Sequence, residues 1–292
     1  MNAGFVPALG TPLDEKGNLC KESLKKQIND QIKSGAVGLL CMGSMGIQAA
    51  IRQDVYPNVA KVAVEAAAGR VPVFVGAMDT SVCRAKERMA AMEELDIAGF
   101  VFTAPYYAAC SRDQMMNYFR QVAAATRHQI LLYDLPSVTQ SKITYDMVLE
   151  LLREVPNFAG IKSADLQMFR KLTLNPAVPD DFIMVYSGLD TFDIAYKWGI
   201  DKCLDGMCSC TPVNSGKMFK AMAEGDYQAA AQRLNKIVAL RDAFLTWDLW
   251  PAYSTAMNLL GYEGTHCPDY CSPIKPEYIA QIRQMLENIG EL

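Results

Sequence analysis

Eight short apolar runs, each followed by a helical pattern, constrain the fold of this chain more than any other feature. The alternation predicts a parallel sheet covered by helices, and eight units close an α/β barrel, the (β/α)8 TIM barrel. A doubly wound open sheet is the alternative, but Gly10-Thr11-Pro12 stands where such a sheet usually carries its Gly-rich dinucleotide loop. The expected strands are Phe5–Leu9, Gly38–Met42, Val71–Gly76, Gly99–Thr103, Gln129–Leu132, Phe158–Ile161, Phe182–Tyr186 and Lys202–Leu204.

Helical patterns fill the stretches between these runs and then continue alone. Beyond Gly225 no strand-like run remains, so we expect a barrel over residues 1–226 and a C-terminal helical extension over 227–292 that packs on it. Residues typical of N-caps open several helices: Thr80, Ser111, Thr144, Asp165, Asp190 and Thr211. The expected helices are Glu22–Lys33, Asp54–Ala67, Ser81–Leu95, Asp113–Thr126, Thr144–Val155, Leu166–Leu174, Thr191–Trp198, Pro212–Ala223, Tyr227–Leu245, Ala252–Leu260 and Pro276–Ile289.

Composition excludes several classes of function. A formal net charge of -4 gives no basis for binding nucleic acid or an acidic membrane surface, and no apolar run approaches the roughly 20 residues that cross a bilayer. The first residues lack the basic segment of a signal peptide, and the nine scattered cysteines favour reduced thiols, so a cytoplasmic protein is expected. Cys208-Ser209-Cys210 and Cys267…Cys271 lack zinc spacing, so no metal is expected.

The segment from Gln129 to Asp165 indicates the chemistry. It contains two strands joined by a helix, and Tyr133 and Lys162 lie at the C-terminal ends of those strands. Parallel strands bring both ends to one rim, where barrel enzymes place their active sites. An amine at the end of an apolar strand is costly to bury unless it is neutral or paired, and a neutral amine attacks carbonyl carbon. The hypothesis is Schiff-base chemistry at Lys162, with the alternative that the side chain reaches solvent or pairs with Asp165.

Other strand ends offer further candidates, each with a structural alternative. Ser44 lies in a Gly-rich turn that either binds an anion or is only a turn. Tyr107 either relays protons or packs at an interface. Asp190 either reaches a substrate or caps the next helix, and Asp205 bonds either a substrate hydroxyl or a backbone N–H.

These residues together resemble the dihydrodipicolinate synthase / N-acetylneuraminate lyase family of class I, Schiff-base-forming aldolases. The resemblance covers nearly the whole chain. It rests on Gly43-Ser44-x-Gly46, Pro105-Tyr106-Tyr107, Tyr133-x-x-Pro136 and Gly160-Ile161-Lys162, in this order and at near-family spacing.

The resemblance implies roles for four residues. Lys162 would condense with the keto carbon of pyruvate or another 2-oxo acid, and Tyr133 would carry the protons. Ser44 would link Tyr133 to Tyr107, which in the family reaches in from a neighbouring subunit. A homotetramer, built as a dimer of dimers, is the implied assembly.

Several positions depart from the family pattern. Met45 and Ile47 replace a threonine and a glutamate, so one hydroxyl for the 2-oxo acid's carboxylate is missing. Asp134 stands where asparagine is more usual. Val138 replaces the arginine with which dihydrodipicolinate synthases grip the second substrate's carboxylate, which argues against that reaction. Thr191 replaces the acid of sialic acid lyases, so sialic acid specificity is not supported.

The expected function is therefore a pyruvate-dependent aldolase that cleaves or forms a 2-oxo-4-hydroxy acid, with sugar-derived acids among the candidates. No cofactor or metal is expected, because the imine withdraws the electrons. Two alternatives remain open: a synthase or dehydratase acting on the same imine, and a non-catalytic protein that binds 2-oxo acids. The residues expected to select the aldehyde are Val138, Asp190, Thr191, Asp205 and Gly206, and Met45 is a further expected substrate-binding residue.

Overall fold

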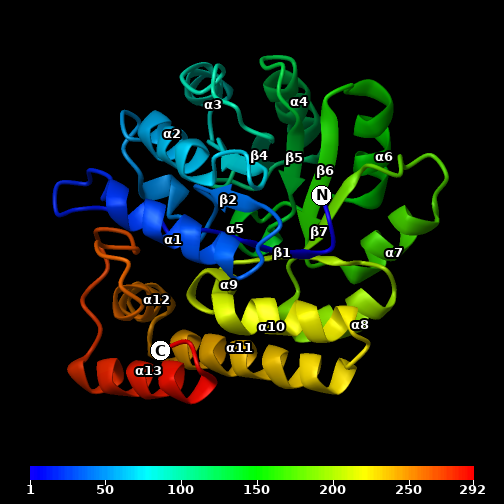
Figure 1. Ribbon diagram of the computed structural model, residues 1–292. Coiled ribbons are helices and arrows are strands. Elements are labelled where there is room, and N and C mark those ends of the chain that lie inside the picture. Colours follow the sequence, from blue (N-terminus) through cyan, green and yellow to red (C-terminus); the bar gives the residue numbers. More distant parts are fainter.

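Eight parallel strands form a single sheet in the computed structural model, which describes residues 1–292 (Figure 1). The strand order is β1-β8-β7-β6-β5-β4-β3-β2, and the two edge strands meet. A parallel bridge joins Ala8 to Leu40, and the Leu9 N–H donates to the Leu40 carbonyl at 2.9 Å. The predicted (β/α)8 barrel is thereby confirmed. The strands are β1 Gly4–Pro7, β2 Leu39–Cys41, β3 Val73–Gly76, β4 Gly99–Thr103, β5 Ile130–Tyr133, β6 Phe158–Ser163, β7 Ile183–Tyr186 and β8 Lys202–Asp205.

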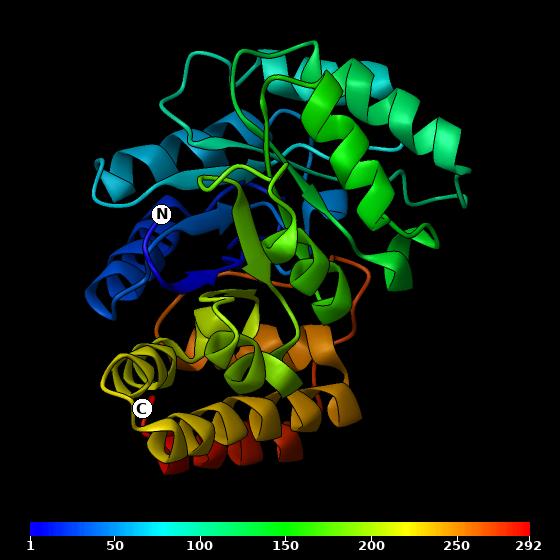
Figure 2. The same cartoon turned by 90° about the vertical axis from the view of Figure 1, so that its right-hand side faces the viewer.

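Helices surround the barrel, and the last three form a layer against one side of it (Figures 1 and 2). Short helical turns that the sequence did not predict occur at four strand-to-helix connections: η1 Gln48–Ala50, α5 Pro136–Thr139, η2 Leu189–Thr191 and α9 Met207–Cys210. The remaining helices are α1 Lys21–Lys33, α2 Tyr56–Ala67, α3 Val82–Ala90, α4 Arg112–Ala123, α6 Tyr145–Glu154, α7 Leu166–Leu174, α8 Phe192–Lys197, α10 Pro212–Ala223, α11 Tyr227–Trp247, α12 Leu249–Leu259 and α13 Pro276–Ile289.

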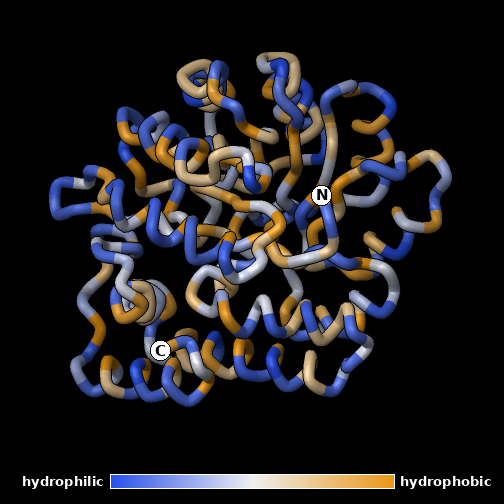
Figure 3. Tube along the Cα trace, viewed as in Figure 1, coloured by the Kyte–Doolittle hydropathy of each residue, from blue (hydrophilic) through white to orange (hydrophobic).

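Side chains along each strand point alternately into the barrel and outward to the layer between the sheet and the helices. On β4, Phe100 stacks edge-on against His128 and Phe102 against Tyr118 of α4, so these rings face outward. Thr103 follows on the opposite, inward face. The strands at the centre of the molecule are largely hydrophobic and most hydrophilic segments lie on outer helices and loops (Figure 3), as expected for strands buried on both faces. No helix is both long and apolar enough to cross a membrane.

The helix caps agree with the sequence only in part. Ser111, Thr144 and Asp165 each accept a hydrogen bond from the third residue of their helix, as predicted. At α3 the cap is Ser81 rather than Thr80.

The cap predicted at Asp190 is wrong, because Thr191 is the N-cap of α8 and Arg241 of α11 binds the Asp190 carboxylate. Thr211 is at the N-cap position of α10 as predicted, but its hydroxyl donates to the Met207 carbonyl at 2.8 Å and caps no N–H group of α10. The first N–H groups of α10 are capped from a distance instead. The Glu291 carboxylate accepts from the N–H groups of Val213 at 3.1 Å and Asn214 at 2.8 Å.

Candidate active site

Tyr133 and Lys162 lie side by side inside the barrel. β5 and β6 each extend further than the sequence predicted, so Tyr133 and Lys162 lie within the strands and pair with each other in the sheet. Their side chains are buried, at 6% and 5% exposure, and the Lys162 Nζ lies 3.8 Å from the centre of the Tyr133 ring. The phenol and the amine therefore share one small, water-poor space at the C-terminal rim.

Lys162 has no carboxylate partner within the chain. The alternative that it pairs with Asp165 is wrong, because Asp165 pairs with Lys142 at 3.0 Å. The Lys162 Nζ lies over the Tyr133 ring in a cation–π contact, which attracts a cation weakly. An amine without an ion pair keeps its lone pair available whenever it loses its proton, which suits a nucleophile.

Asp134 points to the outside of the barrel and joins the two strands that carry these residues. Its carboxylate accepts from the Ile143 N–H at 3.0 Å and from the Ser163 hydroxyl at 2.8 Å, and it forms an ion pair with Lys142. Ser163 follows Lys162 directly. Asp134 thus holds the ends of β5 and β6 together through its carboxylate.

A cavity of about 470 Å³ opens at the C-terminal ends of β2 to β5. Ser44 and Thr103 belong to its lining, and Thr103 is the ladder partner of Tyr133, so the cavity lies next to Tyr133. The buried Thr103 hydroxyl has no hydrogen-bond partner within the chain. The other lining residues are Ile47, Gln48, Ala49, Ala50, Met78, Tyr106, Leu135, Val138, Trp250, Pro268, Asp269 and Tyr270.

Sequence reasoning missed Thr103, Trp250 and Tyr270. For Thr103 a clue was present, since it ends a predicted strand on the same rim as Tyr133. Trp250 and Tyr270 belong to the C-terminal helical region, and no local pattern indicates that they reach the barrel mouth.

The turn after β2 is tightly packed. A Cβ on Gly206 would lie 1.9 Å from the Met45 Cγ, so the Met45 side chain occupies the space above that glycine. Ile47 adopts the left-handed conformation, with φ of 50°, which a β-branched residue tolerates poorly. Ser44 and Met45 thus follow β2 and Gly206 follows β8 on the C-terminal rim; Ser44 and the strained Ile47 line the cavity, whereas Met45 and Gly206 do not.

Tyr107 points away from the cavity of its own chain. It is 89% exposed and lines a separate surface pocket beside α4 with Thr80 and Gln114. Within one chain the structure therefore does not bring Tyr107 to Ser44 and Tyr133. Val138 of α5 lines the cavity and is 53% exposed.

The remaining predicted substrate residues are bound to other groups. Asp190 forms a two-point ion pair with Arg241, with both N–O distances at 2.7 Å, which lowers the pKa of its carboxyl. The Thr191 hydroxyl bonds the Tyr186 hydroxyl at 2.6 Å. Asp205 accepts from the Met207 N–H at 2.8 Å, which was the structural alternative for this acid. Burial raises the pKa of Asp205, and the Met207 hydrogen bond opposes that rise.

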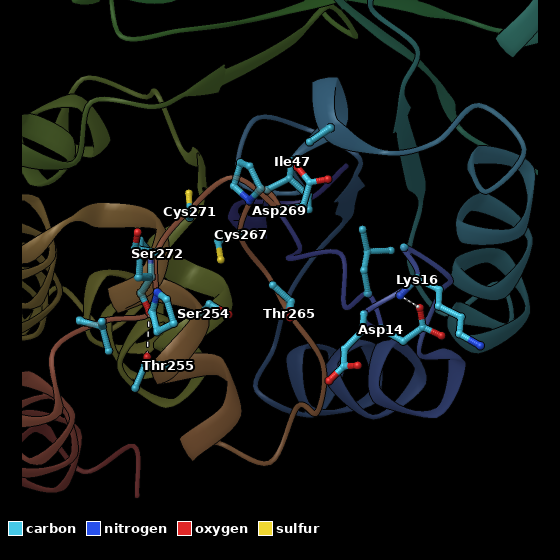
Figure 4. A pocket seen from close by; sticks show the side chains of 18 of the residues that line it. Asp14, Lys16, Ile47, Ser254, Thr255, Thr265, Cys267, Asp269, Cys271 and Ser272 are labelled. Atoms are coloured by element: carbon cyan, nitrogen blue, oxygen red, sulfur yellow. Dashed lines mark hydrogen bonds between the residues drawn. The ribbon is translucent and has the colours of Figure 1, made fainter.

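A second cavity, of about 700 Å³, lies beside the first. Figure 4 shows it between the loop that carries Asp14 and Lys16 and the segment from Thr265 to Ser272. The two cavities share lining residues, among them Ile47 and Asp269. All nine cysteines of the chain are free, including the two that line this cavity.

Comparison with known proteins decides the family. Residues 1–289 match the model of the dihydrodipicolinate synthetase family. The chain belongs to this family. A 4-hydroxy-tetrahydrodipicolinate synthase of Escherichia coli O139:H28 is 29% identical over 231 residues, covering 79% of this chain and 78% of the relative. Family membership makes the chain an enzyme of the class I aldolase type, which includes lyases and synthases.

Solved structures share the fold of this dihydrodipicolinate synthetase family member over its full length. YagE of Escherichia coli K12, a prophage protein solved with pyruvate, superposes with a TM-score of 0.88 at 23% identity and covers 99% of both chains. The N-acetylneuraminate lyase of Proteus mirabilis gives a TM-score of 0.91 at 18% identity, covering 100% of this chain and 99% of its own. At these identities the likeness supports the fold alone.

Proposed function

We propose that the protein is a Schiff-base-forming, pyruvate-dependent aldolase that cleaves or forms a 2-oxo-4-hydroxy acid through an imine on Lys162. The observation that carries the proposal is the buried pair itself, with the Lys162 Nζ 3.8 Å from the Tyr133 ring centre and no carboxylate on the amine. Family membership and the pyruvate bound to YagE support pyruvate as the 2-oxo acid.

The chemistry follows from these two residues. The Lys162 amine attacks the ketone carbon and water leaves, which gives a protonated imine that withdraws electrons from the neighbouring C3–C4 bond. Tyr133 accepts the proton of the C4 hydroxyl as that bond breaks, so an aldehyde departs and an enamine remains. Protonation at C3 and hydrolysis of the imine release pyruvate and restore the amine. Addition of an aldehyde runs the same steps in reverse.

Borohydride reduction in the presence of pyruvate tests this proposal directly. We expect a pyruvate-sized adduct in the intact mass, mapped to the peptide that contains Lys162, because borohydride reduces the imine to a stable amine. Lys162→Ala should abolish the adduct, and Lys202→Ala, which removes a partly buried lysine paired with Asp201, should keep it. An adduct that persists in Lys162→Ala, or its absence in the folded wild-type protein, would refute the proposal.

A synthase or a dehydratase would use the same imine, and product analysis with a panel of 2-oxo acids separates these outcomes. One observation favours the non-catalytic alternative, a 2-oxo acid binding protein. Tyr107 is exposed, so the hydroxyl chain implied for the family is incomplete within one chain. Homo-oligomerisation that buries Tyr107 against a second copy is part of our proposal. Without turnover, pyruvate would bind without exchange of its methyl protons.

A further inference from the structure

The lining of the 470 Å³ cavity indicates a class of aldehyde. Its polar hydroxyl groups near the reacting lysine's strand pair are Ser44, after β2, and Thr103, the ladder partner of Tyr133, so a 2-oxo acid on Lys162 would lie toward this end of the cavity. Further out the wall is apolar and aromatic, and nine of the fourteen lining residues are hydrophobic. We propose that the aldehyde half of the substrate is uncharged, apolar and of aromatic size, and that it binds against Trp250, Leu135 and Val138. This inference rests on the proposed function, because it names the partner of the same imine.

Charge argues against an acceptor that carries a carboxylate. The lining contains no lysine, arginine or histidine, and Asp269 is its only charged residue. An anionic aldehyde would lose its hydration without gaining a cationic partner and would face a negative charge.

Hydrogen-bonding capacity argues against a sugar chain. Each buried hydroxyl needs a partner, or its desolvation is uncompensated. Gln48 is the one side-chain amide in the lining, and its carboxamide oxygen lies 3.1 Å from the Tyr56 hydroxyl, which also donates to the Gln48 backbone carbonyl at 2.6 Å. The outer wall instead presents the rings of Tyr106, Trp250 and Tyr270, which suit contact with a planar apolar group.

The volume is consistent with this class. About 470 Å³ lies within the range of roughly 300–1,000 Å³ that small-molecule sites occupy. Trp250 is half-buried, and Tyr270 and Val138 are exposed at the rim, at 80% and 53%. An apolar ligand would cover these rim side chains and so remove apolar surface from water on both partners.

The test measures kcat/KM for aldehyde addition at saturating pyruvate with three aldehydes: benzaldehyde, glyceraldehyde and succinic semialdehyde. Variants are compared by the ratio of benzaldehyde to glyceraldehyde, so that the intrinsic reactivity of each aldehyde cancels. Trp250→Ala should lower this ratio about 10- to 100-fold while pyruvate trapping on Lys162 is unchanged. Trp198→Ala removes a tryptophan that stacks on Arg170 far from the cavity, and should leave the ratio unchanged.

A second variant guards against misfolding of Trp250→Ala. Val138 is largely exposed, so Val138→Arg should fold, lower the benzaldehyde rate and raise kcat/KM for succinic semialdehyde about tenfold or more. If wild type prefers succinic semialdehyde, or if the variants change both aldehydes equally, the inference is wrong although Lys162 still forms its imine.

Binding without reaction separates this inference from the proposed function. In saturation-transfer NMR, benzyl alcohol should bind the wild-type protein and bind Val138→Arg or Trp250→Ala more weakly, and glycerol should not bind. If pyruvate forms no adduct, the imine mechanism fails, and benzyl alcohol binding still decides whether the cavity accepts an apolar ring. Absence of that binding overturns the inference.

Discussion

The hydrogen bonds and ion pair of Asp134 provide a quantitative test of how β5 and β6, the strands that carry Tyr133 and Lys162, are held together. Asp134→Ala would leave two buried donors without an acceptor, the Ile143 N–H and the Ser163 hydroxyl. Each such group costs about 1–3 kcal/mol, so we expect the free energy of unfolding to fall by about 2–6 kcal/mol. Asp134→Asn keeps an oxygen for Ile143 and can donate to the Ser163 oxygen, but it loses the ion pair with Lys142. That lysine is 40% exposed, so the expected loss is only about 1 kcal/mol.

Urea unfolding followed by circular dichroism measures both values, and m-values that match wild type show that the unfolding transition is comparable. Lys142→Met serves as the partner in a double-mutant cycle. If the ion pair is the only loss in Asp134→Asn, the loss should disappear when Lys142→Met is already present. The reasoning is refuted if the alanine and asparagine variants are equally unstable, or if Asp134→Ala costs less than about 1 kcal/mol.

Three further predictions concern stability. Burial lowers the pKa of His266 from 6.5 to about 4, so between these pH values the unfolded chain binds a proton that the native state does not. About 3 kcal/mol of the free energy of unfolding should therefore be present above about pH 6.5 and be lost as the pH falls toward 4. In urea titrations at a series of pH values, His266→Gln should reduce this dependence of the free energy of unfolding on pH. Ala68→Gly should raise the free energy of unfolding by about 0.5–1 kcal/mol, because Ala68 is exposed at the end of α2 with a φ of 48°, a left-handed conformation that glycine adopts without strain. An unchanged urea midpoint would contradict this prediction. Gly76→Ala should lower the free energy of unfolding by about 3 kcal/mol or more, since the new Cβ would lie 2.0 Å from the Met42 carbonyl oxygen. Thermal stability close to wild type would show instead that the backbone at Met42 can shift.

The sequence predicted the barrel and the neighbouring positions of Tyr133 and Lys162 because both depend on local patterns. Each apolar run is a strand in the structure, and the end of a strand in a parallel barrel has a defined rim. Knowing the strands was therefore enough to place Tyr133 and Lys162 together.

The second half of the site depends on distant contacts that no local pattern contains. Trp250 and Val138 line the same cavity although more than a hundred residues of sequence separate them, and only tertiary packing brings them there. Asp190 illustrates the opposite error. Its position before a helix suggested a cap, but a bidentate contact from Arg241 takes its carboxylate instead.

The long-range cap on α10 has a consequence for the order in which this chain can fold. The helix that completes the last strand–helix unit of the barrel lacks a local cap, and the Glu291 carboxylate binds the N–H groups of Val213 and Asn214 across a sequence separation of 78 and 77 residues. During synthesis on a ribosome, eight strands and their helices can emerge while the start of α10 is still uncapped. These two hydrogen bonds can form only after Glu291, which follows α13, has been made and has docked at the start of α10, so the last helix of the barrel depends on the C-terminal end of the chain for its cap.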